Sequence, residues 1–174
     1  METKPDPIPP ATSARISVVM PCYNAAPFVR EAVEADMVKL VAQTRNSAVV
    51  PDLRRQIAAQ RAVIDSHPEN FMRLDEEFHR SLATAAGKSQ VFKVVANVKA
   101  QMDRVRYLTL MHRSVIMISI DQHDAVVDAI ERGDPMAADE AMRTHLRQIL
   151  TDLPHVAKLK PDFFENIDFQ SNAA

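Results

Sequence analysis

The stretch FMRLDEEFHRSLATAAGK, residues 71–88, shows most directly how this chain folds. Its apolar residues recur every three or four positions, which predicts a helix with one buried side. Asp75 and His79 fall on that side, because residues four apart in a helix lie one above the other. Gly87 follows the last apolar position and predicts the helix end. The stretch therefore predicts a helix that turns a carboxylate and an imidazole toward the protein interior.

The composition of the chain is that of an ordinary globular domain. Its 174 residues are 47% hydrophobic and 25% charged, and the formal net charge of −2 argues against a surface built for nucleic acid or an anionic membrane. The single Cys22 excludes an internal disulfide framework and fits a reducing compartment. No apolar run is long enough to span a bilayer. We therefore expect a soluble, cytoplasmic protein that does not enter a membrane.

The chain contains only two glycines, Gly87 and Gly133, and each follows a helical pattern. Because hairpins depend on glycine for their turns, this scarcity favours helices. The sequence predicts an all-α, antiparallel helical bundle over residues 28–153, the arrangement that builds metal and ligand sites from facing helices. Residues 1–27 are expected to form a proline-rich, partly disordered leader, and residues 154–174 a C-terminal tail.

The apolar spacing predicts the first four helices. They are expected at about residues 27–46, 51–66, 68–87 and 89–112, with a proline in the favoured first turn of the second and third. The apolar residues expected to face the core in the first, second and fourth of these helices are Val29, Val33, Met37, Leu40, Val41, Leu53, Ile57, Ala58, Val91, Val95, Val98, Met102 and Val105.

Two more helices are predicted in the last third of the chain. The run VIMISI has strand propensity, but no neighbouring segment offers it a partner strand. Ser119 with Gln122 three residues later predicts a capping box that starts a helix. Asp134 and Pro135 predict the cap and first turn of the last helix, which we expect to close near Pro154.

Two histidines on these later helices also face inward. His123 precedes three apolar residues at helical spacing, and His145 shares a side with several others. Together with Asp75 and His79, they place four ionisable side chains in the bundle core. Burying them unpaired would cost several kcal/mol.

One divalent transition metal would satisfy all four groups. Imidazoles and a carboxylate suit Zn or Ni, with Mn, Co or Fe as alternatives. The competing interpretation is that each histidine is a hydrogen-bonded core residue. Arg104 and Arg106 lie on the long fourth helix, and one of them could tip into the bundle and grip a small organic acid with two parallel hydrogen bonds.

Four motifs in this order resemble a known family. VREAVEADMVKLVA, FMRLDEEFHRSLATAAGK, DQHDAVVDAIERGD and AADEAMRTHL resemble the FCD domain, the C-terminal effector-binding domain of the FadR branch of GntR-type transcription regulators. The resemblance covers about residues 28–153. It implies an all-α bundle of six or seven helices that encloses a metal-dependent ligand pocket and forms a homodimer.

The resemblance also implies roles for individual residues. A small carboxylate effector would complete the coordination of the metal, and the pocket arginine falls in the RVR segment, on Arg104 or Arg106. Lys88 departs from the family, which commonly has asparagine there. The residues of this sequence that match the family's metal ligands are Asp75, His79, His123 and His145.

The N-terminal region departs from the family. Those regulators carry a winged helix of about seventy residues before the bundle, where fewer than thirty residues stand here, so we expect DNA contact only through a module absent from this chain. The stretch ARISVVMPCYNAAPFVREAVEA resembles the start of family-2 glycosyltransferases. No parallel α/β domain and no Asp-x-Asp motif follow it, so transferase activity is not expected.

These observations leave three candidate functions. The first is a metal-dependent sensor of a small organic acid, which is not an enzyme and acts within a GntR-type regulator. The second is a metalloenzyme acting on a small carboxylate, which the lack of an inward-facing general base disfavours. The third is a metal-free helical interaction module.

Overall fold

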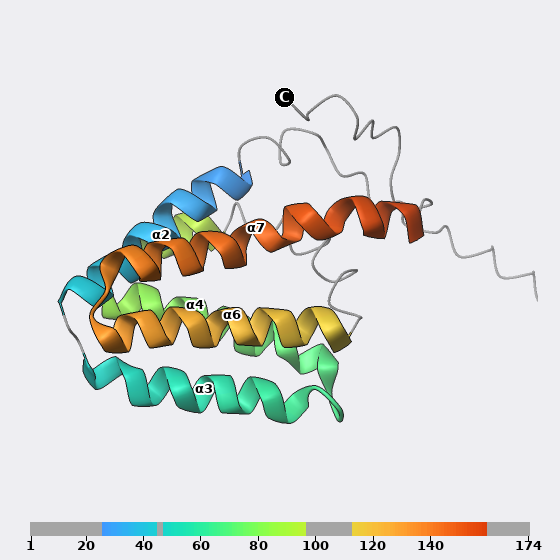
Figure 1. Cartoon of the computed structure of the whole chain (residues 1–174), viewed down its shortest axis with the longest axis horizontal. Coiled ribbons are helices and arrows are strands. Elements are labelled where there is room, and N and C mark those ends of the chain that lie inside the picture. The colour runs from blue at the N-terminus through green and yellow to red at the C-terminus, as the bar shows by residue number, and fades with distance from the viewer. Residues whose placement is uncertain (1–25, 45–46, 97–112, 160–174) are drawn as a thin grey trace, which may run out of the picture.

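The computed structural model describes residues 26–44, 47–96 and 113–159, and all the regular structure in them is helical (Figure 1). The prediction of an all-α protein is therefore confirmed over these ranges. Most of the predicted leader lies outside them, as do Val98, Met102 and Val105. The elements, in order, are α2 (Ala26–Gln43), η1 (Ser47–Val49), α3 (Val50–Val63), η2 (Pro68–Asn70), α4 (Phe71–Ala85), a helical segment at residues 89–96, α6 (Arg113–Arg132) and α7 (Pro135–Leu159).

Five helices enclose the main apolar core, and a second, smaller cluster is formed by Met37, Ala83 and Phe92. α2 makes its largest contact with α7, α7 packs on α6, α6 on α3, α3 on α4, and α4 returns to α2. Figure 1 shows α6 and α7 packed side by side and antiparallel, joined by a turn at one end. No helix in the described ranges is long and apolar enough to cross a membrane. The largest apolar side chains of the main core are Leu53, Phe71, Phe78, Leu82, Ile116, Ile120 and Met142.

The two glycines end helices as predicted. Gly87 and Gly133 have φ values of +68° and +63°, which cost glycine less than any residue with a side chain. At the end of α4, the amide of Lys88 donates to the carbonyl of Ala83 at 2.8 Å. At the start of α7, Asp134 Oδ1 accepts from the backbone N–H of Ala137 at 3.1 Å, so the predicted cap is confirmed.

Two predicted helix boundaries were wrong. α6 includes Arg113, and Ser119 is buried in its interior, so Ser119 does not cap the start of a helix. The VIMISI run is helical, and its residues Ile116 and Ile120, which are four positions apart, both face the core. α7 continues to Leu159, beyond the predicted end near Pro154. A proline removes one backbone donor of a helix but leaves the donors after it in place.

Some predicted core faces were also wrong. Val29, Ala58 and Val91 are exposed, while polar residues at neighbouring positions are buried. α2 contacts α4, α6 and α7, so it is covered on several sides and its apolar stripe does not define its buried surface. The buried polar residues of α2 and α3 are Arg30, Glu31, Glu34 and Gln60.

Candidate metal centre

The structure brings Asp75, His79, His123 and His145 together in the bundle core. Asp75 and His79 lie on α4, His123 on α6 and His145 on α7. Their exposed fractions are 0%, 1%, 0% and 5%, and one potential ligand atom from each lies within 4.8 Å of all the others. The four residues that were predicted from their helical spacing thus form one compact cluster.

The atoms that meet in this cluster are three imidazole nitrogens and one carboxylate oxygen. His145 Nε2 lies 3.2 Å from His79 Nε2 and 3.2 Å from His123 Nε2. Asp75 Oδ1 lies 3.8 Å from His79 Nε2 and 3.6 Å from His123 Nε2. All three rings therefore point the same nitrogen toward a common centre.

The opposite nitrogen of two of these rings faces a glutamine oxygen. His123 Nδ1 lies 2.8 Å from Gln60 Oε1, and His145 Nδ1 lies 3.1 Å from Gln122 Oε1. The Gln60 amide nitrogen donates to the carbonyl of Leu74 at 3.2 Å, which assigns its oxygen to the histidine. Since an amide oxygen only accepts, Nδ1 of both rings carries the proton.

The third ring, His79, faces a carboxylate. Its Nδ1 lies 2.5 Å from Glu34 Oε2, so the ring nitrogen and the carboxylate oxygen are in direct contact. Burial raises the pKa of Glu34, but Arg30 and His79 outweigh it and lower the pKa from 4.5 to about 2. An ionised carboxylate at this distance keeps the proton of His79 on Nδ1.

Protons on all three Nδ1 atoms leave three Nε2 lone pairs converging in a buried space. Two nitrogen lone pairs 3.2 Å apart repel each other. A proton added to Nε2 of His145 could form a hydrogen bond with Nε2 of His79 or of His123, but not with both. Two nitrogens bound to one zinc at its usual bond length and tetrahedral angle lie about 3.3 Å apart. The donor set and its spacing therefore fit a divalent transition metal.

Phe78 packs against two of the three imidazole rings. Its ring stacks on His123 with centroids 4.2 Å apart and meets His79 edge-on at 5.7 Å. Phe78 is fully buried, one position before His79 on α4. A stacked ring restricts rotation of His123 and keeps water from its face.

Arg30, which was not predicted as a site residue, reaches this cluster through Glu34, the carboxylate behind His79. Arg30 is buried, and its Nε donates to Glu34 Oε1 at 2.6 Å. Its Nη2 is also buried, and finds no acceptor within the described ranges. A guanidinium with a buried open donor can bind an anion. Arg104 and Arg106, the predicted pocket arginines, lie outside the described residues.

Three residues whose side-chain oxygens lie behind the rings were not predicted from the sequence: Glu34, Gln60 and Gln122. Glu34 could have been noticed because it stands four residues after Arg30, the spacing of an ion pair in a helix. Gln60 and Gln122 carry no comparable local signal. Their contacts with histidines on other helices arise only when the helices pack.

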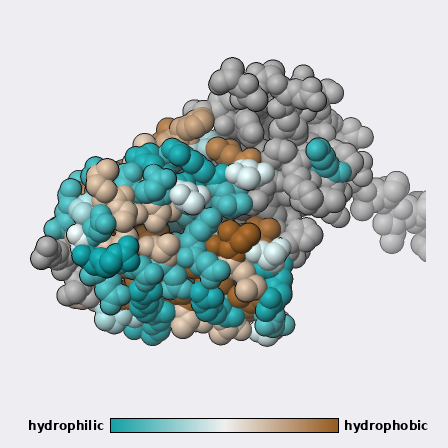
Figure 2. Space-filling view, in the orientation of Figure 1, coloured by the Kyte–Doolittle hydropathy of each residue, from teal (hydrophilic) through white to brown (hydrophobic). Residues whose placement is uncertain are grey.

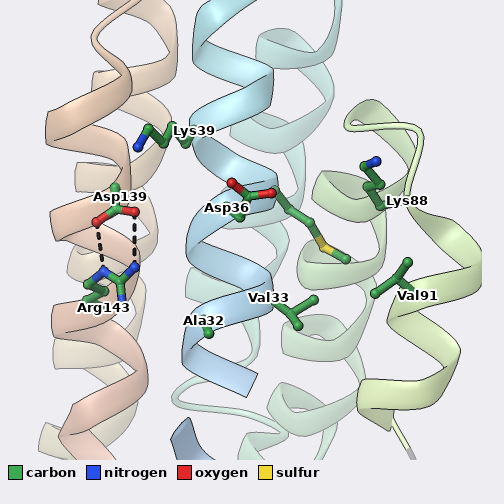
Figure 3. A pocket seen from close by; sticks show the side chains of 9 residues that line it. Ala32, Val33, Asp36, Lys39, Lys88, Val91, Asp139 and Arg143 are labelled. Atoms are coloured by element: carbon green, nitrogen blue, oxygen red, sulfur yellow. Dashed lines mark hydrogen bonds and ion pairs between the residues drawn. The ribbon is translucent and has the colours of Figure 1, made fainter. Parts of the chain in front are cut away.

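A separate surface pocket of about 500 Å³ lies between α2, α7 and the start of the segment 89–96 (Figure 3). Val33, Met37 and Val91 form its apolar part. Its charges have both signs, and Arg143 in its wall is bonded to Asp139. It contains none of the four clustered residues.

Comparison with known proteins relates this geometry to a family. The FCD domain model matches residues 28–148. The chain is 35% identical to an uncharacterized HTH-type transcriptional regulator of an unstable DNA locus in Streptomyces ambofaciens, over 89% of this chain and 66% of that protein. It is 28% identical to the HTH-type transcriptional repressor RspR of Escherichia coli K12, over 79% of this chain and 60% of the repressor.

A third relative is the HTH-type transcriptional repressor NanR of Citrobacter rodentium, 33% identical over 67% of this chain and 45% of the repressor. The chain thus spans from 45% to 66% of the length of these three regulators. The family match extends from the start of α2 into α7 and contains all four clustered residues. The chain therefore belongs to the FCD domain family of GntR-type transcription regulators.

Proposed function

We propose that this chain is a metal-dependent sensor domain for a small organic acid. Asp75, His79, His123 and His145 would hold one divalent ion, with zinc or nickel favoured and manganese, cobalt or iron as alternatives. The observation that carries this proposal is the convergence of three Nε2 lone pairs, 3.2 Å apart at the two closest contacts, beside a buried carboxylate.

Arg30 supports the choice of an acid as the effector. A carboxylate ligand could bind the ion with one oxygen and accept a hydrogen bond from the open Nη2 of Arg30. Arg104 or Arg106 would add a second cationic partner. When bound, the ion supplies a positive charge that attracts the acid, while the protein residues fix its orientation.

Regulation would follow from a difference in acid affinity between two arrangements of the bundle. The relatives are named as HTH-type transcriptional regulators and repressors, so we propose that the bundle acts as a homodimer and passes this difference to a DNA-binding module. This role requires no turnover of the acid, so we propose that the chain is not an enzyme.

The first test is metal content, measured by inductively coupled plasma mass spectrometry on purified protein. We expect about one transition-metal ion per chain, and almost none in a His123→Ala, His145→Ala variant. His67→Ala is the matched control, because His67 is exposed and lies against Glu69 instead of the cluster. Wild-type protein without metal, even after reconstitution, would exclude the metal-dependent sensor.

The second step is calorimetric titration of the metal-loaded protein with a panel of small mono- and dicarboxylic acids. An acid that binds the loaded protein and not the stripped protein would support the effector proposal. Arg30→Met should weaken the binding of that acid, while the variant should still hold one metal ion per chain. A concentration of free acid that falls steadily with time would instead indicate that the protein is an enzyme.

A further inference from the structure

The three imidazoles are backed by unlike groups. A carboxylate, Glu34, lies behind His79, whereas neutral amides, Gln60 and Gln122, lie behind His123 and His145. The proton stands on Nδ1 in all three rings, so the rings differ in the charge behind them and not in their tautomer. This asymmetry is not needed to orient the rings, because a third glutamine would do that equally well.

A carboxylate behind an imidazole makes its far nitrogen a stronger donor, because negative charge at Nδ1–H raises the basicity of Nε2. Burial strengthens this effect. Glu34 and His79 are 3% and 0% exposed at their side chains, so little solvent screens the charge. Arg30 bonds to Oε1 of Glu34, which leaves Oε2 to face His79.

Glu34 also connects the cluster to a helix that contributes none of the four clustered residues. It lies on α2, while Asp75, His79, His123 and His145 lie on α4, α6 and α7. An ion drawing electron density from His79 would strengthen the attraction of His79 Nδ1–H for Glu34. The position of α2 would then depend on whether the centre is loaded.

We propose that Glu34 is a positioning residue of the metal centre, which makes His79 the strongest of the three nitrogen donors and couples loading of the centre to helix α2. This inference rests on the proposed function, because it presupposes the metal. It adds that the charge of one residue outside the ligand set controls affinity.

The test is Glu34→Gln, which keeps an oxygen for His79 and removes the charge. Metal affinity would be measured by competition with a chromophoric chelator, using zinc. Loss of an outer carboxylate partner weakens metal binding by about 10- to 100-fold in comparable sites, and we expect a loss in that range. The rise in melting temperature on adding zinc should shrink accordingly, a change that a merely structural role would not produce.

Glu31→Gln is the matched control. Glu31 lies on the same helix, is also buried, and pairs with Arg143 and Arg147 of α7 instead of a histidine. Its loss should lower the melting temperature of the metal-free protein and leave zinc affinity within about twofold of wild type. Equal losses of affinity in Glu31→Gln and Glu34→Gln would overturn the inference.

Restoring the charge elsewhere gives a second readout. In the Glu34→Gln background, Gln122→Glu places a carboxylate behind His145, and Gln148, which now accepts from Gln122, can turn its amide to donate. We expect this double variant to regain part of the lost zinc affinity. If Glu34→Gln alone fails to fold because Arg30 is left unpaired, Arg30→Met with Glu34→Gln removes both partners and should show the same affinity loss.

The outcomes separate the two proposals. Wild-type protein that binds none of zinc, nickel, manganese, cobalt and iron would overturn the proposed function, and this inference with it. Wild-type protein that binds zinc while Glu34→Gln binds it equally well would overturn this inference alone. Hydrogen–deuterium exchange gives the last check, because zinc should slow exchange in α2 of the wild type and less so in Glu34→Gln.

Discussion

Two of the polar clusters that join helices in this protein differ in the charges that they bring together. The first is the buried group of Asp75 and three histidines. The second lies between α3 and α6, where Arg54 donates to Asp124 at 2.9 Å and to Glu131 at 2.8 Å, with Asp128 beside them. The face over α3 and α6 is largely hydrophilic (Figure 2), so water also reaches this second cluster.

The cluster around Arg54 is complete as it stands. The hydrogen bonds that Arg54 donates to Asp128 and Glu131 raise the pKa of Arg54 despite some burial, so the cation and the carboxylates stabilise one another's charged forms. The buried cluster has converging lone pairs and no cation among its four members. The difference indicates where a cation would bind, because three ring nitrogens and a carboxylate oxygen converge in the buried cluster with no cation among its members.

Removing the metal should produce the largest effect, and only through the buried cluster. A ligand present at about a thousandfold above its Kd stabilises the folded state by about 4 kcal/mol. We therefore expect a chelator to lower the free energy of unfolding by about that amount relative to protein saturated with zinc. Thermal unfolding with zinc, and with chelator in excess over zinc, would measure it.

The control for this experiment is the His123→Ala, His145→Ala variant. Because it lacks two of the converging nitrogens, zinc and chelator should give it the same melting temperature. If the wild type also melts at one temperature under both conditions, and does so with nickel, manganese, cobalt and iron in place of zinc, the buried cluster is a hydrogen-bonded core, and the comparison with the cluster around Arg54 fails.

The sequence allowed the four clustered residues to be predicted because each has a local signal. Asp75 and His79 are one helical turn apart, and His123 and His145 each stand among apolar residues at helical spacing. Gln60 contacts a histidine on another helix, 63 positions away. No periodicity within one helix reports such a contact, because it depends on how far the two helices slide along each other.

The fold was predictable to a similar depth. Gly87 and Gly133 ended helices as expected, since the left-handed conformation at a helix end is a local requirement. Ser119 failed as a helix start because the apolar pair Ile116 and Ile120 continues the buried side through it. The buried side of α2 was misjudged because ion pairs allow Glu31 and other charged residues to lie inside.

An intermediate effect is expected from Glu31, which resembles the buried cluster in its burial and the cluster around Arg54 in its pairing. The hydrogen bond from Arg147 lowers its pKa below the ordinary 4.5, burial opposes this, and Arg143 adds to the lowering. A lowered folded pKa gives stability that is complete above 4.5 and lost as pH falls through the folded value.

Glu31→Gln should therefore cost about 2 kcal/mol at pH 7, the contribution of a hydrogen bond to a charged group. The cost should shrink as the pH falls below 4.5, because the wild type then loses the same charge. Urea unfolding of both proteins from pH 7 to pH 3 would measure it. A difference between the two proteins that stays constant over this range would show that Glu31 acts through packing alone.

The smallest effect is expected from Arg54→Met, which removes the cation of the self-satisfied cluster. Exposed ion pairs contribute little because water screens them and two side chains must be ordered, so we expect a loss below about 1 kcal/mol. Added salt should reduce the difference between variant and wild type further. Zinc affinity should not change, because Arg54 donates its hydrogen bonds to Asp124, Asp128 and Glu131, which are outside the buried cluster. A weakening of zinc binding in this variant would show that the two clusters are coupled through α6, and that the bundle of helices responds to the metal as one unit.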